Sequence, residues 1–273
     1  MNFEDRADFN SSTRNQVFLQ FGNVDINISS VYRLETKGET AWDEKQFVED
    51  IAASYQTFLE AYILPRLSIH TETSHSSSLS EKPGYIQDLY LCKATLPIVG
   101  DDDLPESHAK YQYTKSKKKD DQHTTEELEE LELQSARCAE RVRPLIHLCG
   151  IEARRRMTAD FNARLTAFTL GIRDKFSCNR SARFHVVDLN QYIRKESDSD
   201  EVDAQYITND PTNLHVTWEN TLQFWVQELA SAGLEASHMP AKGKLDEQWA
   251  KYSDRKEKQR KTMRQKGKAL EAT

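Results

Sequence analysis

Apolar side chains recur at steps of three and four residues between positions 124 and 176, the longest helical pattern in the chain. Thr124, followed three residues later by Glu127, fits a capping box, which satisfies free amide groups at a helix start. Gly150 interrupts the pattern, and a second apolar stripe begins at Ile151. The pattern therefore predicts two long central helices that meet near residue 150.

Apolar and polar positions alternate near the N-terminus, which is the pattern of a half-buried strand. Positions 17–21 and 24–34 alternate on either side of Gly22-Asn23, a dipeptide typical of turns, so this stretch predicts a β-hairpin. Three later segments give shorter strand signals: 184–193, 206–207 and 214–218. The predicted fold class is α+β and helix-dominated, with a small antiparallel sheet that includes the N-terminal β-hairpin.

Two further helical stripes flank the central pair. Residues 43–63 form an amphipathic pattern that ends near Pro65, and residues 218–229 form another that stops at Gly233. A last helical pattern starts at Leu245 and becomes polar on all sides beyond Tyr252. We therefore expect a basic C-terminal helix or tail.

The patterning divides the chain into a loose N-terminus (1–14), a single helical α+β domain (15–250) and a basic C-terminal tail (251–273). Polar segments without periodicity predict mobile loops within the domain. These loops lie near residues 68–84, 100–123 and 195–204.

Composition limits the class of protein. The chain has 273 residues and a hydrophobic content of 37%, below the usual value of about 45–50%. Its four cysteines show no CxxC spacing, and no long apolar run is present. These features favour a cytoplasmic or nuclear protein with reduced thiols and no membrane contact.

Positive charge is concentrated in two zones. Eleven Lys and Arg stand against four Asp and Glu from Arg137 to Arg183, which gives +7. Nine stand against two from Lys251 to Lys268, again +7, so the remainder of a chain with net charge −7 carries −21. Ten of the eleven basic residues in the first zone are arginines, whose guanidinium groups suit phosphate, so the zone indicates contact with a polyanion. The alternative is a solvated face paired with the glutamates upstream.

The candidate nucleic-acid-binding residues come from both zones. They are Arg137, Arg141, Arg155, Arg156, Arg173, Lys256, Arg260, Lys261 and Arg264. Arg154 differs from these residues because helical geometry places it on the same face as the apolar stripe of the second central helix. Three interpretations of Arg154 are open: a side chain that extends out of the core edge, an internal ion pair, or a ligand phosphate.

No motif for catalysis, metal binding or nucleotide binding is present: GxGxxG, a P-loop, GxSxG, HExxH and an EF-hand loop are all absent. His70 and His75 lack a second ligand at helical spacing, and the adjacent side chains of Asp101 to Asp103 cannot all face one ion. We therefore expect no cofactor, no metal and no catalytic residue.

The leading hypothesis is a non-enzymatic binding or assembly protein that contacts the RNA or DNA phosphate backbone through the arginine-rich helical face and the basic tail. The first alternative is a protein–protein scaffold, in which the acidic and basic zones pair with a partner or by self-association. The second is an enzyme whose catalytic groups meet only in the fold.

Overall fold

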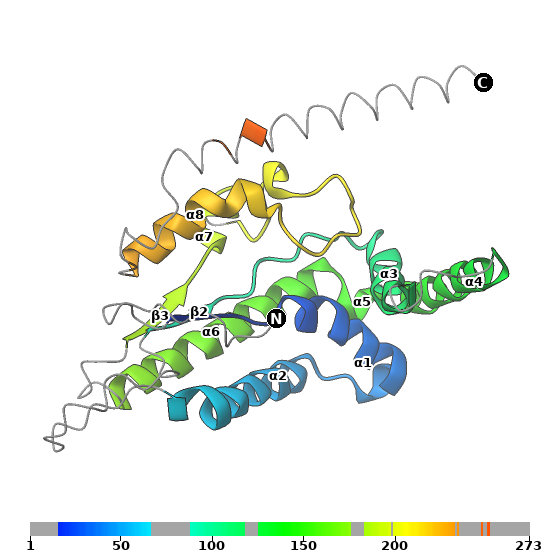
Figure 1. Ribbon diagram of the computed structural model, residues 1–273. Helices are drawn as coiled ribbons and strands as arrows, with labels where there is room; N and C mark the ends of the chain where they lie inside the picture. The colour runs from blue at the N-terminus through cyan, green and yellow to red at the C-terminus, as the bar shows by residue number, and fades with distance from the viewer. Residues whose placement is uncertain are drawn as a thin grey trace, which may run out of the picture.

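The computed structural model describes residues 16–66, 88–117, 125–175, 183–197 and 199–232, together with Leu234, Glu247, Ala250 and Lys251. The strands and α-helices follow one another in this order (Figure 1): β1 (Gln16–Gln20), α1 (Ser30–Lys37), α2 (Glu44–Phe58), β2 (Asp88–Cys92), α3 (Leu104–Lys117), α4 (Thr125–Val142), α5 (Ile146–Cys149), α6 (Ile151–Lys175), β3 (Arg183–Val187), α7 (Asn190–Ile193) and α8 (Trp218–Ser231). A π-helical turn, Asp25–Ser29, leads into α1, and another, Leu59–Ile63, extends α2.

The three strands form one parallel sheet in the order β1-β2-β3. The register aligns Phe18 with Tyr90 and Tyr90 with His185. The prediction of an antiparallel sheet is therefore wrong, although the predicted predominance of helix is confirmed. Parallel neighbours need long crossover connections, and helices make those connections here.

The predicted N-terminal β-hairpin is also wrong, because the chain turns into a helix after Gly22. The alternating pattern included Tyr32, whose exposed fraction is 50%, and skipped Val31, which is completely buried. The buried residues Ile28, Val31 and Leu34 follow one another at steps of three, which is helical spacing. Apolar residues at every second position from 24 to 28 hid this period.

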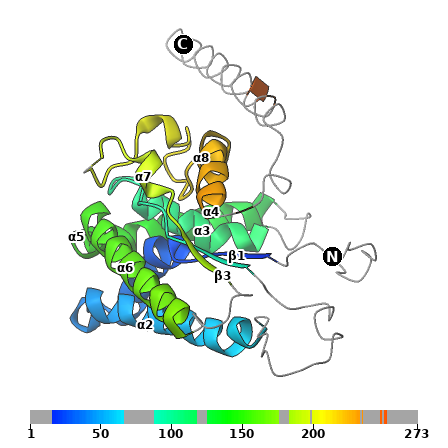
Figure 2. The same ribbon diagram turned by 90° about the vertical axis from the view of Figure 1, so that its left-hand side faces the viewer.

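The sheet lies between helices (Figures 1 and 2), and β2 contributes side chains to both faces. Leu89 and Leu91 join the core cluster that contains Phe161 of α6. Tyr90 and Cys92 join a separate cluster that includes Leu229 of α8. All five residues of β2 are buried, as expected for a central strand with helices on both faces.

The long helices agree with the apolar stripes. The helix predicted after Gly150 is α6, and α2 packs along it through Phe47 and Val48. The Asp43 side chain caps α2 by accepting a hydrogen bond from the amide of Gln46 at 3.0 Å. The helical pattern at 218–229 corresponds to α8, so these predicted helices are confirmed.

Several predicted segments differ from the structure. The helix α3 occupies most of the expected loop at 100–123. The sequence pattern does not indicate this helix, because its buried face carries Ser107 and His108 in place of an apolar stripe. The strand candidates at 206–207 and 214–218 form no strand, and residues 190–193 are helical. The loop near 68–84, the N-terminus up to residue 15 and the tail beyond 251 lie outside the described residues. In the described part of the chain, no helix has the length and apolar character needed to cross a membrane.

Candidate ligand site at the carboxyl ends of the strands

The parallel arrangement brings the carboxyl ends of all three strands to one edge of the sheet. The residues that follow are Asn23 after β1, Lys93–Leu96 after β2 and Asp188–Asn190 after β3. In open sheets with parallel strands, ligands bind in the crevice beyond this edge. This region is therefore the first place to look for a functional site.

Two buried asparagines fix the chain as it leaves β2. Asn162 of α6 accepts from the amide of Ala94 at 2.8 Å and donates to its carbonyl at 2.9 Å. Asn190 donates to the same carbonyl at 3.0 Å and accepts from the amide of Leu96 at 2.9 Å. The backbone at residues 94–96 thus has side-chain partners in place of strand partners, and this edge is rigidly held.

A third asparagine ties β1 to the same segment. Asn23 accepts from the amide of Thr95 at 2.7 Å and donates to the Thr95 hydroxyl at 2.6 Å. Its position depends on Gly22, which has a φ of 93° and faces Phe161 too closely for a Cβ atom. The turn after β1 therefore places an amide and a hydroxyl side by side at the edge of the sheet.

A cavity of about 490 Å³ lies beyond these groups. Its size falls within the range of about 300–1,000 Å³ that is usual for small-molecule sites. Strand ends, the loop after Thr208 and α8 contribute the lining residues: Gln20, Asn23, Thr95, Leu189, Thr208, Asn213, His215, Val216, Thr217, Thr221 and Trp225.

Seven of the eleven lining residues carry an amide or a hydroxyl group and none is Lys, Arg, Asp or Glu, but apolar atoms make up most of the exposed lining surface. The other four lining residues are His215, Trp225, Leu189 and Val216. The nearest charges along the strand ends pair with each other, since Lys93 donates to Asp188 at 2.8 Å. Such a surface offers donors and acceptors to a ligand without a strong charge preference.

Local hydrogen bonds shape the loop side of the cavity. The Asn213 side chain accepts from the backbone amide of His215 at 3.0 Å. Thr217, the N-cap of α8, is held by Tyr206, whose carbonyl accepts from the Thr217 amide at 2.8 Å. The exposed His215 side chain is therefore presented by an ordered loop.

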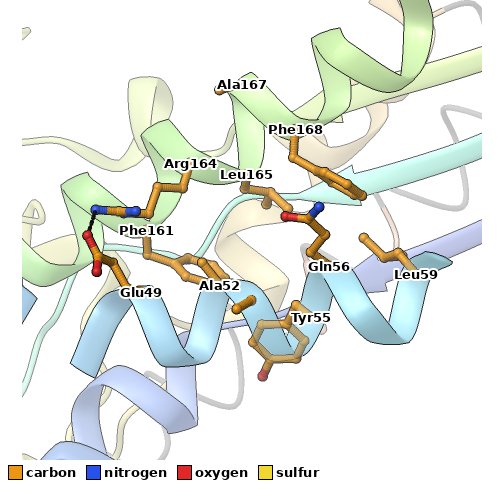
Figure 3. A pocket seen from close by; sticks show the side chains of 11 residues that line it. Glu49, Ala52, Tyr55, Gln56, Leu59, Phe161, Arg164, Leu165, Ala167 and Phe168 are labelled. Atoms are coloured by element: carbon orange, nitrogen blue, oxygen red, sulfur yellow. Dashed lines mark hydrogen bonds and ion pairs between the residues drawn. The ribbon is translucent and has the colours of Figure 1, made fainter. Parts of the chain in front are cut away.

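A second cavity, of about 430 Å³, separates α2 from α6. Figure 3 shows Ala52 and Gln56 of α2, with Leu59 of the π-helical turn that follows, facing Phe161 and Phe168 of α6 across it. Its charged groups, Glu49 and Arg164, bind each other at 3.1 Å. The remaining lining is mostly apolar, so this groove offers few groups that could orient a ligand.

The predicted phosphate-binding arginines do not converge on either cavity. Arg141 pairs with Glu35, Arg155 with Glu152 and Arg156 with Glu44. Arg173 lines a third cavity beside β3 and α8, of about 360 Å³. No carboxylate in the described ranges pairs with Arg137 or Arg173, and Lys256, Arg260, Lys261 and Arg264 lie outside those ranges.

Arg154 is completely buried between elements. Its guanidinium donates to the carbonyl oxygens of Cys149 at 2.9 Å and Val99 at 2.7 Å, and to the amide oxygen of Asn27 at 3.2 Å. The Asp101 carboxylate lies 3.6 Å away. Burial lowers the pKa of Arg154 to about 10, so the group stays charged at neutral pH. These contacts correspond to the internal ion pair, extended by backbone carbonyls.

Sequence reasoning missed the residues that build the cavity at the strand ends. The Gly22-Asn23 turn was recognised, but as the turn of a hairpin. In a parallel sheet, polar residues just after the strands lie at one edge and indicate a candidate site. Asn23 and Asn190 are such residues. Thr208 and His215 lie in the loop after the 3₁₀ turn Ala204–Tyr206, and Trp225 lies on α8; only the fold brings these segments to this edge.

No protein-family model, curated protein or solved structure matches the chain.

Proposed function

We propose that the protein binds a small, neutral, hydrogen-bonding molecule in the cavity at the carboxyl ends of β1, β2 and β3. One observation carries the proposal: a cavity of about 490 Å³ at this edge combines amide, hydroxyl, imidazole and indole side chains with apolar surface, and none of its lining residues is Lys, Arg, Asp or Glu. A few polar groups that fix orientation within a preformed cavity are typical of small-molecule sites.

The rigid edge supports this proposal. Because Asn23, Asn162 and Asn190 already satisfy the backbone of residues 94–96, that segment does not need a ligand in order to be stable. A preformed site loses little conformational entropy when it binds. The partial positive charge at the start of α8 favours a ligand that places a hydroxyl or carbonyl oxygen there.

Ligand-dependent thermal stability tests the proposal. The full chain is screened against sugars, nucleosides, polyols and small amides, with singly charged analogues of each as comparison. A ligand at one hundred times its Kd stabilises the folded state by about 2.7 kcal/mol, which a thermal melt detects readily. We expect neutral members of the set to raise the Tm more than their charged analogues.

Variants in the cavity lining, with a histidine variant elsewhere as control, locate the site. His215→Ala and Asn213→Ala are expected to remove the ligand-dependent rise in Tm. His147→Ala changes another exposed histidine, on α5, and should leave it intact. A screen without hits, or hits that His215→Ala and Asn213→Ala do not weaken, contradicts the proposal.

Binding of nucleic acid and a role as a protein scaffold stay predictions. The ion pairs of Arg141, Arg155 and Arg156 do not favour the first, because a phosphate has to displace a carboxylate of the same chain at each position. The hypothesis of an enzyme likewise stays open.

A further inference from the structure

Three side chains that can bind a metal ion meet where α1, α3 and α4 pack together. Glu35 comes from the last turn of α1, His108 from α3 and Cys138 from α4. One possible ligand atom from each lies within 4.8 Å of the others. The cluster is at the end of the molecule that α3 and α4 form in Figure 1, and it shares no residue with the cavity at the strand ends.

The Glu35 carboxylate is oriented by a residue outside the cluster. Arg141, one turn beyond Cys138 on α4, donates from Nε to Glu35 Oε1 at 2.6 Å. The other oxygen, Oε2, lies 3.2 Å from His108 Nε2. Carboxylates that bind metals are commonly held by such outer hydrogen bonds, which fix the direction of the ligating oxygen. Arg141 therefore directs Oε2 toward the imidazole.

The imidazole and the thiol are both withdrawn from solvent. His108 is completely buried, Cys138 is 1% exposed, and the Glu35 side chain is 15% exposed. A neutral imidazole is the form that binds metals. The Nδ1 atom of His108 has no hydrogen-bond partner among the described residues. The ring atom that faces Glu35 is the other nitrogen, Nε2, so Nδ1 gives no sign of the metal position.

We propose that Glu35, His108 and Cys138 form a binding site for a divalent transition-metal ion, with Zn²⁺ the best match. Imidazole and thiolate suit Zn²⁺, whereas Mg²⁺ and Ca²⁺ prefer oxygen ligands. Zinc bonds of about 2.0–2.3 Å put neighbouring tetrahedral ligands about 3.2–3.8 Å apart. The 3.2 Å separation of Glu35 Oε2 and His108 Nε2 already fits one edge of that tetrahedron.

The charges and the coordination number are consistent with this ion. Binding replaces the S–H bond of Cys138 with a metal–sulfur bond and releases that proton to solvent, and it requires the imidazole proton of His108 to be on Nδ1, so that Nε2 has a free lone pair. Thiolate and carboxylate together then balance the two positive charges of the ion, while the charge of Arg141 lies at the surface, since its side chain is 54% exposed. Three protein ligands leave a fourth position for water or another small ligand, and the partly exposed Glu35 provides the route to it.

Cobalt substitution tests the site directly. The full chain is treated with a chelator, dialysed and titrated with Co²⁺, whose bond to a thiolate gives a charge-transfer absorption in the near ultraviolet. We expect this band to saturate at one ion per chain and to disappear when Zn²⁺ is added. Zn²⁺ should also raise the Tm of the chelator-treated chain.

Two pairs of variants make the result specific. Cys138→Ser should abolish the band, whereas Cys149→Ser, which changes another buried helical cysteine, should retain it. Glu35→Gln keeps the shape of the side chain and should lower the affinity for Co²⁺ at least about tenfold, with Glu39→Gln as its control. Far-ultraviolet circular dichroism checks that each variant folds. If Cys138→Ser does not fold, Glu35→Gln still tests the site. The proposal is overturned by the absence of a thiolate band in the original chain, or by a band that survives Cys138→Ser.

Discussion

At the scale of single residues, Arg154 shows how a charge becomes part of the core. Its guanidinium joins the end of α5, the segment after β2 and the turn before α1 through Cys149, Val99 and Asn27. Each of these acceptors needs a donor once it is buried. Arg154 therefore supplies hydrogen bonds that no apolar side chain can replace.

Arg154→Met is expected to destabilise the folded chain by about 3–5 kcal/mol, since it leaves buried acceptors and the Asp101 carboxylate without their partner. The free energy of unfolding in urea measures this loss. Arg156→Met removes a neighbouring arginine that is 63% exposed and pairs with Glu44, and should cost at most about 1 kcal/mol. Equal losses in the two variants would contradict the structural role given to Arg154.

Gly22 offers a second test at this scale, with Gly171 as its natural control. A Cβ atom at Gly22 would lie 2.7 Å from Phe161 Cε1, and the φ of 93° is unfavourable for alanine, so Gly22→Ala should lower the free energy of unfolding by about 1–3 kcal/mol. Gly171 lies within α6 and has no neighbouring atom within 4 Å of a built Cβ, so Gly171→Ala should raise it by up to about 1 kcal/mol. Thermal melts that show the same sign for both variants would contradict this account.

At the scale of elements, sequence reasoning succeeded where one apolar stripe dominates and failed where polar residues are buried. The helices α2, α6 and α8 have long stripes, and the patterns found them. The helix α3 has none, because Ser107 and His108 face the interior, and so the sequence pattern predicts a loop there. The predicted antiparallel direction of the strands follows from the predicted hairpin. That hairpin is predicted because apolar residues before and within α1 recur partly at every second position, which is the pattern of a strand.

The candidate sites were even less accessible to sequence reasoning. The cavity at the strand ends depends on Asn23, Thr95 and His215, which are far apart in the chain and carry no motif. Of the proposed metal ligands, Glu35 and His108 are 73 residues apart in the sequence, and Cys138 lies on another helix. Their spacing therefore matches no metal-binding motif. Arg154 was identifiable because it lies within the stripe of a single helix.

The asparagine contacts after β2 yield a prediction at the same scale. Asn162→Ala leaves the buried amide of Ala94 without its partner, so we expect a loss of about 1–3 kcal/mol in the free energy of unfolding and weaker ligand binding in the adjacent cavity. Thr166→Ala on the same helix removes a hydroxyl that bonds only within α6 and should change stability by less than about 0.5 kcal/mol. Denaturant titration distinguishes the two, and an Asn162→Ala chain as stable as Thr166→Ala would contradict this prediction.

At the scale of the whole molecule, the ion pairs alter the meaning of the basic zones. Several arginines of the first zone already bind carboxylates contributed by α1, α2 and α6. The sequence-level charge of this zone therefore overstates the charge available to a partner. The second zone, residues 251–268, has a net charge of +7 in the sequence and is the stronger indication of a polyanion partner.

If the chain binds RNA or DNA, we expect a chain that ends after Tyr252 to lose that binding, whereas replacing both Arg155 and Arg156 by Ala should preserve it. Titration with labelled nucleic acid at two salt concentrations measures the effect, because the logarithm of the affinity falls with the logarithm of salt in proportion to the phosphates contacted. Tight binding that persists without the tail would place the contact on the folded domain instead.

The parallel sheet also determines when the protein can complete its fold. Residue 16 of β1 pairs with residue 88 of β2, and residue 88 pairs with residue 183 of β3, so neither pairing is local. Contacts this distant in sequence form slowly. During synthesis, β2 has no partner on one side until the ribosome has passed residue 187, and a strand with an open edge readily pairs with another chain. Truncated products that end before β3 should therefore aggregate, and the last third of the chain is what completes the fold.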